Sequence, residues 1–151
     1  MRAFTIIELI IAVLIFSLIL GGIFGIVLVA DKSWDSTLGM LGLVQEIRQG
    51  MDGMTREARQ SSFSQATVSI GGERLDFFTP GSISVISYYV QNNQLIREHP
   101  AGTTKVLANH ISQISFTSSA SMLQIQITAN KTTIGNRALS ISSVQQVKWR
   151  N

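Results

Sequence analysis

The stretch that decides the fold is LIIAVLIFSLILGGIFGIVLVA, residues 9–30. It contains no charged residue, and Ser17 is its one strongly polar side chain. A helix needs about 20 apolar residues to cross the ~30 Å hydrocarbon layer of a membrane, and this stretch has 22. A buried helix in a small domain would have a polar face, which this stretch lacks. We therefore predict a membrane-embedded helix over residues 9–30.

A second helical pattern follows directly, over residues 31–60. Proline is absent, and apolar residues recur three or four positions apart, as on one face of a helix. They form the predicted stripe, which consists of Trp34, Leu38, Leu41, Val44, Ile47, Met51, Met54 and Ala58. Trp34 fits a second role equally well, as an aromatic anchor at the membrane interface. Because the first proline is Pro80, the two helices are compatible with one rod from about Thr5 to Gln60, ~84 Å long at ~1.5 Å per residue.

After Ser61 the period becomes that of β-strands. Strands are predicted at 66–70, 74–79, 82–90 and 95–98, and the clearest alternation of apolar and polar residues predicts another at 123–128. The Asn92-Asn93 pair predicts a hairpin turn, because asparagine tolerates a positive φ. Residues 103–108 fit either a strand or a helix. Leu139, Ile141, Val147 and Trp149 share one parity, which predicts one or two further strands.

These patterns predict an α+β fold. The four glycines between residues 39 and 53 weaken the second helical segment by about 1 kcal/mol each relative to alanine. We therefore expect the stripe to be held by packing. An antiparallel sheet with one apolar face needs a cover, and the stripe is the one long amphipathic helix in the sequence that can supply it. The predicted organisation is a leader at 1–3, an apolar helix at 4–30, an amphipathic helix at 31–60 and a β domain at 61–151.

Composition argues against several classes of protein. The 151 residues leave room for one domain, and the chain has no cysteine, which excludes disulfides, thiolate zinc sites and thiol nucleophiles. No serine lies in a Gly-x-Ser-x-Gly motif, and Gly71-Gly72 is not followed by the Gly-Lys-Ser of a phosphate loop. His99 and His110 lack the spacing of metal ligands, and Glu73 and Asp76 are too few for a calcium loop. We expect no catalytic residue, no cofactor and no metal.

The first eight residues, Met1-Arg2-Ala3-Phe4-Thr5-Ile6-Ile7-Glu8, put a carboxylate at the edge of the apolar stretch. A secretory signal has a shorter apolar core, followed by a small-residue cleavage site. Ionised carboxylates in membrane helices are costly and are normally paired and functional. Glu8 therefore indicates a specific partner, and the alternative is a carboxylate that is simply solvated at the headgroup edge.

Phe4-Thr5-Ile6-Ile7-Glu8, followed by an uninterrupted apolar helix, resembles the class III signal of type IV pilins and type II secretion pseudopilins. The resemblance implies that a prepilin peptidase cuts between Ala3 and Phe4 and methylates the new amine. Ala3 stands where the family usually has glycine. Residues 54–62 and the strands after them are similar to J-type minor pseudopilins and W-type minor pilins, which implies a minor structural subunit; the alternatives are another minor pilin or a competence pseudopilin.

The resemblance also implies partners and a location. The partners are other pilin-like subunits, the prepilin peptidase, and an assembly platform with its ATPase. The chain would first span the inner, or cytoplasmic, membrane with its N-terminus in the cytoplasm and the β domain outside, and would then join a pilus or pseudopilus. The residues expected to serve subunit register and assembly are Glu8 and Thr5, and we expect Glu8 to pair with the positive Phe4 amine of a neighbouring subunit. Such a pair would fix axial register more than it adds stability, because desolvation offsets the attraction.

The alternative function is a single-pass membrane protein whose β domain binds a ligand or DNA without forming a filament. Residues 61–151 contain seven basic and three acidic residues, a net charge of +4, and competence-type pilins bind DNA. The basic residues are scattered, and Lys148-Trp149-Arg150 is their one cluster. This pattern favours a solvated surface over a DNA-binding site.

Overall fold

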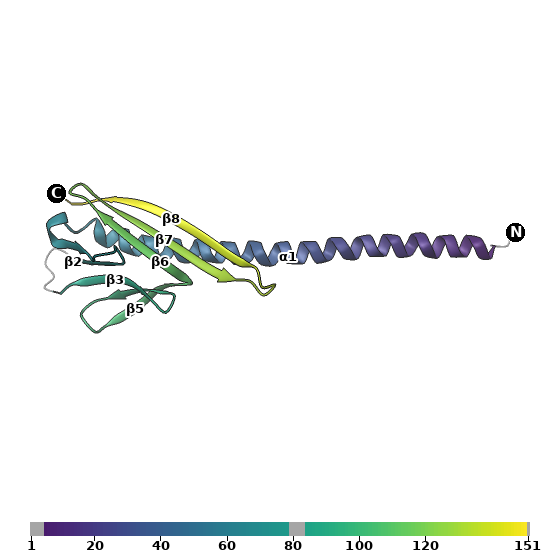
Figure 1. Ribbon diagram of the computed structural model, residues 1–151, viewed down its shortest axis with the longest axis horizontal. Coiled ribbons are helices and arrows are strands. Elements are labelled where there is room, and N and C mark those ends of the chain that lie inside the picture. The colour runs from purple at the N-terminus through teal and green to yellow at the C-terminus, as the bar shows by residue number, and fades with distance from the viewer. Residues whose placement is uncertain (1–4, 79–83, 151) are drawn as a thin grey trace.

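The computed structural model describes residues 5–78 and 84–150 (Figure 1). A single helix, α1 (Ile6–Ala58), runs for 53 residues, or ~80 Å. Its C-terminal part lies against a β domain, and its N-terminal part extends away from that domain alone (Figure 1). The apolar and amphipathic segments thus form one continuous rod, and the predicted α+β fold is confirmed.

The β domain contains two antiparallel sheets. The five-stranded sheet has the order β1-β2-β3-β4-β5, and the three-stranded sheet has the order β6-β7-β8. A short 3₁₀ helix, η1 (Phe63–Gln65), leads from α1 into the first sheet. The strands are β1 (Ala66–Val68), β2 (Arg74–Phe77), β3 (Ile86–Gln91), β4 (Gln94–Glu98), β5 (Thr104–Asn109), β6 (Ile111–Ser118), β7 (Met122–Thr132) and β8 (Ala138–Lys148).

Most predicted strands are present, but the chain forms two sheets where one was expected. Of the alternatives left open, residues 104–109 are a strand, and residues 138–148 form one strand. The hairpin turn between β3 and β4 lies at Asn92 and Asn93, whose φ angles are 52° and 58°. Positive φ at both positions is the backbone of a two-residue hairpin turn that matches strand twist. The predicted strand residues 79, 82 and 83 lie outside the described part of the chain.

Strand β6 was missed because its apolar spacing is irregular. Ile111, Ile114 and Phe116 are all buried, although the first two are three positions apart and have opposite parity. The pairing of β6 with β7 shifts register between Ile111 and Gln113. A bulge of this kind inserts one residue into a strand and inverts the alternation beyond it.

The helix packs on the sheets through a seam that differs from the predicted stripe. Its buried apolar residues are Leu43, Ile47, Met51, Met54 and Ala58. Trp34, Leu38 and Leu41 were expected in the stripe but are exposed, whereas Leu43 was not expected and is fully buried. A straight α-helix drifts by about 20° per heptad from a 3.5-residue repeat, so a stripe with that period leaves the contact face.

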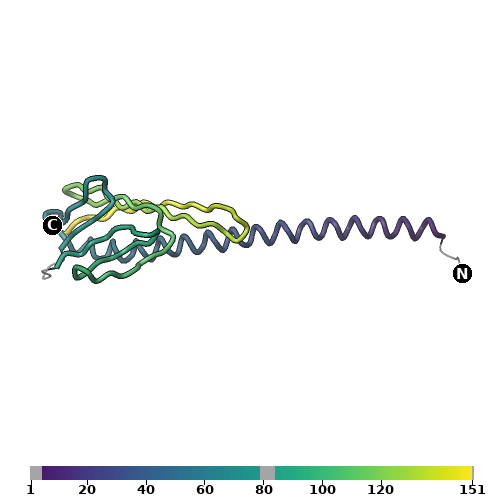
Figure 2. The backbone as a smooth tube through the Cα atoms, turned by 60° about the horizontal axis from the view of Figure 1, so that its bottom comes forward, coloured from purple at the N-terminus to yellow at the C-terminus, as the bar shows by residue number. Residues whose placement is uncertain are grey.

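Few strands extend beyond the seam. The β7–β8 hairpin is the part of the β domain that reaches farthest along α1 toward the N-terminus (Figure 2). The helix before Asp35 therefore has no sheet to cover it, which is a second reason why Trp34 stays exposed.

Candidate functional site

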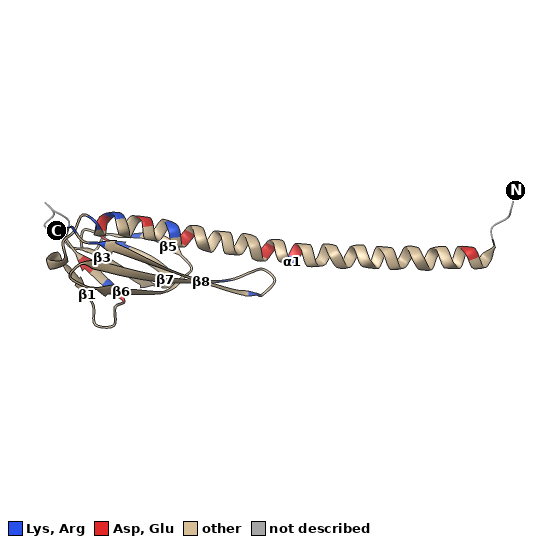
Figure 3. Ribbon diagram, turned by 90° about the horizontal axis from the view of Figure 1, so that it is seen from above, with Lys and Arg blue, Asp and Glu red and all other residues tan. Residues whose placement is uncertain are grey.

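The apolar half of α1 is a long uncovered surface. Every residue from 5 to 34 is exposed, including the whole charge-free stretch 9–30. Figure 3 shows charged residues on the β domain and the C-terminal part of the helix, with very few along the N-terminal part. The helix is long and apolar enough to cross a membrane. An apolar surface this large is not stable in water and marks contact with lipid or with other protein surfaces.

Thr5 and Glu8 lie together at the start of α1. Thr5 is the N-cap residue, in extended conformation, and its hydroxyl oxygen accepts a hydrogen bond from the Glu8 backbone N–H at 3.4 Å. The Thr-x-x-Glu spacing is that of a helix capping box, and a carboxylate in the first turn is favoured by the helix dipole. Thr5 thus has a structural role that the sequence analysis missed, although the spacing was a sufficient signal for it.

The Glu8 carboxylate has no ion-pair partner among residues 5–78 and 84–150. Within that part of the chain the ion pairs are Arg74–Asp76, Arg74–Glu98 and Arg97–Glu57. Glu8 is exposed at one end of the apolar stretch, where a neighbouring molecule has free access to it. Ala3 and Phe4, the predicted processing residues, lie outside the described residues.

A polar cluster at the other end of α1 was not predicted. The Tyr88 hydroxyl donates to Glu57 Oε2 at 2.7 Å, and Arg97 Nε donates to both Glu57 oxygens at 3.0 and 3.1 Å. Tyr88 and Arg97 are directly opposite each other on β3 and β4. The turn at Asn92-Asn93 fixes that register, so the pairing of Tyr88 with Arg97 was predictable, whereas their shared contact with Glu57 was not.

The cluster ties the last turn of α1 to the five-stranded sheet. Burial, and then the adjacent Glu57 carboxylate, raise the pKa of the Tyr88 hydroxyl well above its ordinary value of 10.0. Partial burial lowers the pKa of Arg97, but the hydrogen bonds and negative charge of Glu57 outweigh it, and the net pKa is raised. The tyrosine therefore stays neutral and the guanidinium charged, as expected of groups that stabilise a fold.

Arg74 organises a second polar cluster, on the five-stranded sheet. Its Nε donates to the two Asp76 oxygens at 2.9 and 3.2 Å, its Nη2 donates to Ser87 Oγ at 2.9 Å, and its guanidinium lies 5.1 Å from the centre of the Tyr89 ring. The hydrogen bond to Asp76 raises the pKa of Arg74. Among the described residues, no group of three or more histidines or carboxylates could hold a metal ion.

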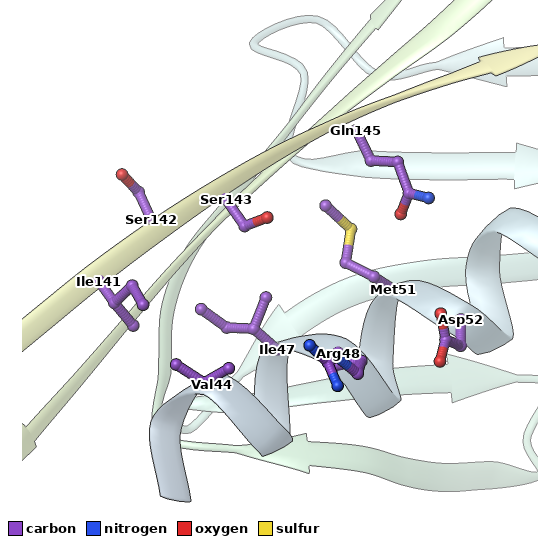
Figure 4. Close-up of a pocket in the computed structure, with 9 residues that line it drawn as sticks. All are labelled: Val44, Ile47, Arg48, Met51, Asp52, Ile141, Ser142, Ser143 and Gln145. Atoms are coloured by element: carbon purple, nitrogen blue, oxygen red, sulfur yellow. The ribbon is translucent and has the colours of Figure 1, made fainter. Parts of the chain in front are cut away.

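A groove of about 370 Å³ separates α1 from β8 (Figure 4). Its lining residues are Val44, Ile47, Arg48, Met51 and Asp52 on the helix and Ile141, Ser142, Ser143 and Gln145 on β8. Arg48 and Asp52 are its charged residues, and neither serine has a histidine in this groove to act as a base. The groove therefore offers a contact surface of mixed polarity without a nucleophile–base pair.

The basic C-terminal cluster does not form a binding surface for bases. Trp149 is buried, and its indole N–H donates to the Ser119 backbone oxygen at 3.0 Å. Lys148 and Arg150 are exposed. A buried tryptophan cannot stack on a nucleotide base, so this cluster lacks the aromatic platform on which single-strand binding depends.

Comparison with known proteins adds no assignment: no protein-family model, curated protein or solved structure matches this chain.

Proposed function

We propose that the chain is a structural, pilin-like minor subunit of a type IV pilus or type II secretion pseudopilus. The observation that carries the proposal is the form of α1, a single helix that contains the uncovered apolar stretch 9–30 and whose last 16 residues are packed on a β domain. A membrane anchor alone needs no rigid connection to its domain. A subunit of a helical bundle does, because a continuous rod transmits the position of the packed helix to the domain outside it.

Glu8 supports the same proposal. In a bundle of such helices, the surroundings of Glu8 become apolar, and an unpaired carboxylate there is strongly disfavoured. Cleavage before Phe4 would give each subunit a positively charged amine four residues away from Glu8. Glu8 of one helix can reach the Phe4 amine of a neighbour at a single offset along the bundle axis. The pair would therefore set the axial stagger between subunits.

The remaining features fit a role without catalysis. The groove beside β8 lacks a nucleophile–base pair, and the two polar clusters join elements of the fold. In this proposal the chain depends on a prepilin peptidase for processing and on an assembly platform and ATPase for extraction from the membrane. Arg2, the one charge before the motif, would hold the N-terminus on the cytoplasmic side of the inner membrane.

Mass spectrometry of the N-terminus tests the proposal. The full chain would be isolated from membranes that contain a prepilin peptidase and from membranes that lack it. We expect the first sample to begin at Phe4 with one methyl group on its amine, and the second to keep Met1. An intact Met1 in chains recovered from the assembled state would contradict the proposal.

The role of Glu8 is tested separately by co-isolation of pilin-like subunits with a tagged full chain. We expect Glu8→Gln to reduce recovery strongly, because the carboxylate that would pair with the neighbouring amine is gone. Asp31→Asn is the matched control, since it removes an exposed carboxylate from the same helix. Equal recovery with wild type and Glu8→Gln would refute the register role while leaving the processing result unaffected.

A further inference from the structure

The tip of the β7–β8 hairpin is attached to α1 just beyond the apolar stretch. The Gly135 backbone N–H donates to Asp35 Oδ2 at 3.4 Å, and Arg137 Nη1 donates to Ser36 Oγ at 3.3 Å. In Figures 1 and 3 this tip projects along the helix toward the N-terminus, beyond the other strands. The hairpin therefore has a fixed position relative to the end of the apolar stretch.

The distance along the helix puts the tip at the depth of lipid headgroups. The apolar stretch ends at Ala30, and Asp35 is five residues farther, ~7.5 Å along the axis at ~1.5 Å per residue. The headgroup layer on each side of a bilayer is about 5–8 Å thick, given ~30 Å of hydrocarbon in a total of ~40–45 Å. A tilt of about 20°, which is usual for membrane helices, shortens the distance by less than 1 Å.

The side chains at this level suit such a layer. Ile134, at the tip, is 98% exposed, and Trp34, one helical turn beyond Ala30, is 68% exposed. Tryptophan is enriched at membrane interfaces. An exposed isoleucine is also more stable at the edge of the hydrocarbon than in water, because its apolar surface is removed from water. A hollow of about 360 Å³ lined by Val29, Thr133 and Arg137, among others, connects the apolar stretch with the tip.

Charge at this level also favours phospholipid. Lys32, Lys131 and Arg137 give three positive charges near the tip, against the two carboxylates of Asp31 and Asp35. Asp35 accepts the Gly135 N–H, and Arg137 donates to the neutral Ser36 hydroxyl, so neither basic residue beside Ile134, Lys131 at the end of β7 or Arg137 just before β8, is in an ion pair among the described residues. Lysine and arginine bind phosphate oxygens through charge-assisted hydrogen bonds.

We propose that the β7–β8 tip is a membrane-contact element, in which Ile134 inserts among phospholipid headgroups while Lys131 and Arg137 bind their phosphates. The inference rests on the proposed membrane anchoring by residues 9–30. With the helix and the hairpin both in contact with one leaflet, the β domain has a fixed orientation on the membrane. That orientation would present the groove between α1 and β8 in a constant direction to incoming subunits.

Single cysteines test the contact cleanly, because the chain has none of its own. Full chains with Ile134→Cys, Ile70→Cys or Val27→Cys would carry a fluorophore and be placed one per phospholipid nanodisc, with nitroxide quenchers on the lipids. Ile70 is the matched control, a fully exposed isoleucine (107%) in another turn. The turn that contains Ile70 is hydrogen-bonded to Phe116, which pairs with Ile125 of β7. Ile125 is seven residues from the end of β7 at the hairpin tip, so the Ile70 turn lies ~23 Å from the tip.

We expect headgroup quenchers to quench position 134 strongly and position 70 weakly, and acyl-chain quenchers to quench position 27. If position 27 were quenched and position 134 were quenched no more than position 70, the tip contact would be overturned and the anchor would stand. No quenching at 27 would overturn the anchor, and the tip contact with it. Two further chains place the fluorophore at position 136, one with Asn136→Cys alone and one that also has Ile134→Asp. We expect Ile134→Asp to remove most of the quenching at position 136, and unchanged quenching would also overturn the insertion of Ile134.

Discussion

The two halves of α1 are both rich in apolar residues, yet they have opposite surroundings. Residues 43–58 bury an apolar face on the two sheets, and their charged residues are either exposed or hydrogen-bonded to a strand, as Glu46 and Glu57 are. Residues 9–30 are apolar on all sides and are uncovered. A helix that is apolar on one face has its partner within the chain, whereas a helix that is apolar all round needs a partner outside it. The change from one pattern to the other along one helix marks where the fold ends and the assembly surface begins.

The first and last carboxylates of α1 repeat this contrast. Glu57 is held by Tyr88 and Arg97 of the same chain. Glu8, at the opposite end, has no ion-pair partner among the described residues. One carboxylate closes the fold, and the other is left for a group on a neighbouring molecule.

The largest expected effect comes from shortening a buried side chain in the packed half of α1. Leu43 is 0% exposed and Leu41, two positions away, is 60% exposed. Leu43→Ala removes buried methyl groups and leaves a cavity, so we expect a loss of about 2–5 kcal/mol in the free energy of unfolding. Leu41→Ala should change it by less than about 0.5 kcal/mol. Denaturant unfolding of the full chain in nanodiscs, followed by the fluorescence of buried Trp149, measures both; equal losses would contradict the packing seam.

A charge in the uncovered half should affect membrane insertion and leave the fold intact. Ile19 lies in the middle of the apolar stretch, so Ile19→Arg should weaken insertion by about 3 kcal/mol. Leu38→Arg is the control on the same helix, at an exposed position outside the stretch. The fraction of chain that resists alkaline extraction from membranes measures the effect. If Ile19→Arg and Leu38→Arg were extracted alike, residues 9–30 would not be the anchor.

The Glu57 cluster gives the packed half a dependence on alkaline pH. Because the folded state raises the pKa of Tyr88 above 10.0, its contribution to stability is complete below pH 10 and is lost as the pH rises through the raised pKa. Above pH 10 this group should lower the free energy of unfolding by about 1.4 kcal/mol per pH unit. Tyr88→Phe should remove that slope and Tyr89→Phe, the control at the other tyrosine, should keep it, as measured by unfolding between pH 8 and 11 in ~0.5 unit steps.

Regular patterns were predictable, and departures from regularity were not. The charge-free stretch and the absence of proline before Pro80 were enough to predict two adjoining helices and to allow one continuous helix, which α1 is. The burial of Leu43 in place of Leu41 depends on which face of α1 the sheets cover, which no local pattern records. Strand β6 was hidden by the bulge after Ile111, because a bulge breaks the alternation by which strands are recognised.

The candidate site divides in the same way. Glu8 and Thr5 were singled out by the motif at residues 4–8. Their Thr-x-x-Glu spacing is also that of a helix capping box, and Thr5 is the N-cap residue of α1. The contact of Glu57 with Tyr88 and Arg97 joins residues 31 and 40 positions apart, so it depends on how the sheet is placed on the helix. The hydrogen bond between Gly135 and Asp35 joins residues 100 positions apart and could not be predicted from the sequence for the same reason.

Glycine provides the finest test of where the covered half begins. A Cβ added at Gly50 would lie 2.7 Å from Leu95 Cδ2 and 3.4 Å from Ala108 Cβ, whereas one added at Gly42 would meet nothing within 4 Å. Alanine at either site gains about 1 kcal/mol of helix propensity. At Gly50 the overpacking of β4 and β5 costs about 1–3 kcal/mol, so Gly50→Ala should be destabilising by about 1 kcal/mol on balance, while Gly42→Ala is stabilising. Unfolding of both variants under identical conditions measures the difference, and a gain at Gly50 as large as at Gly42 would show that the helix does not approach the sheet so closely.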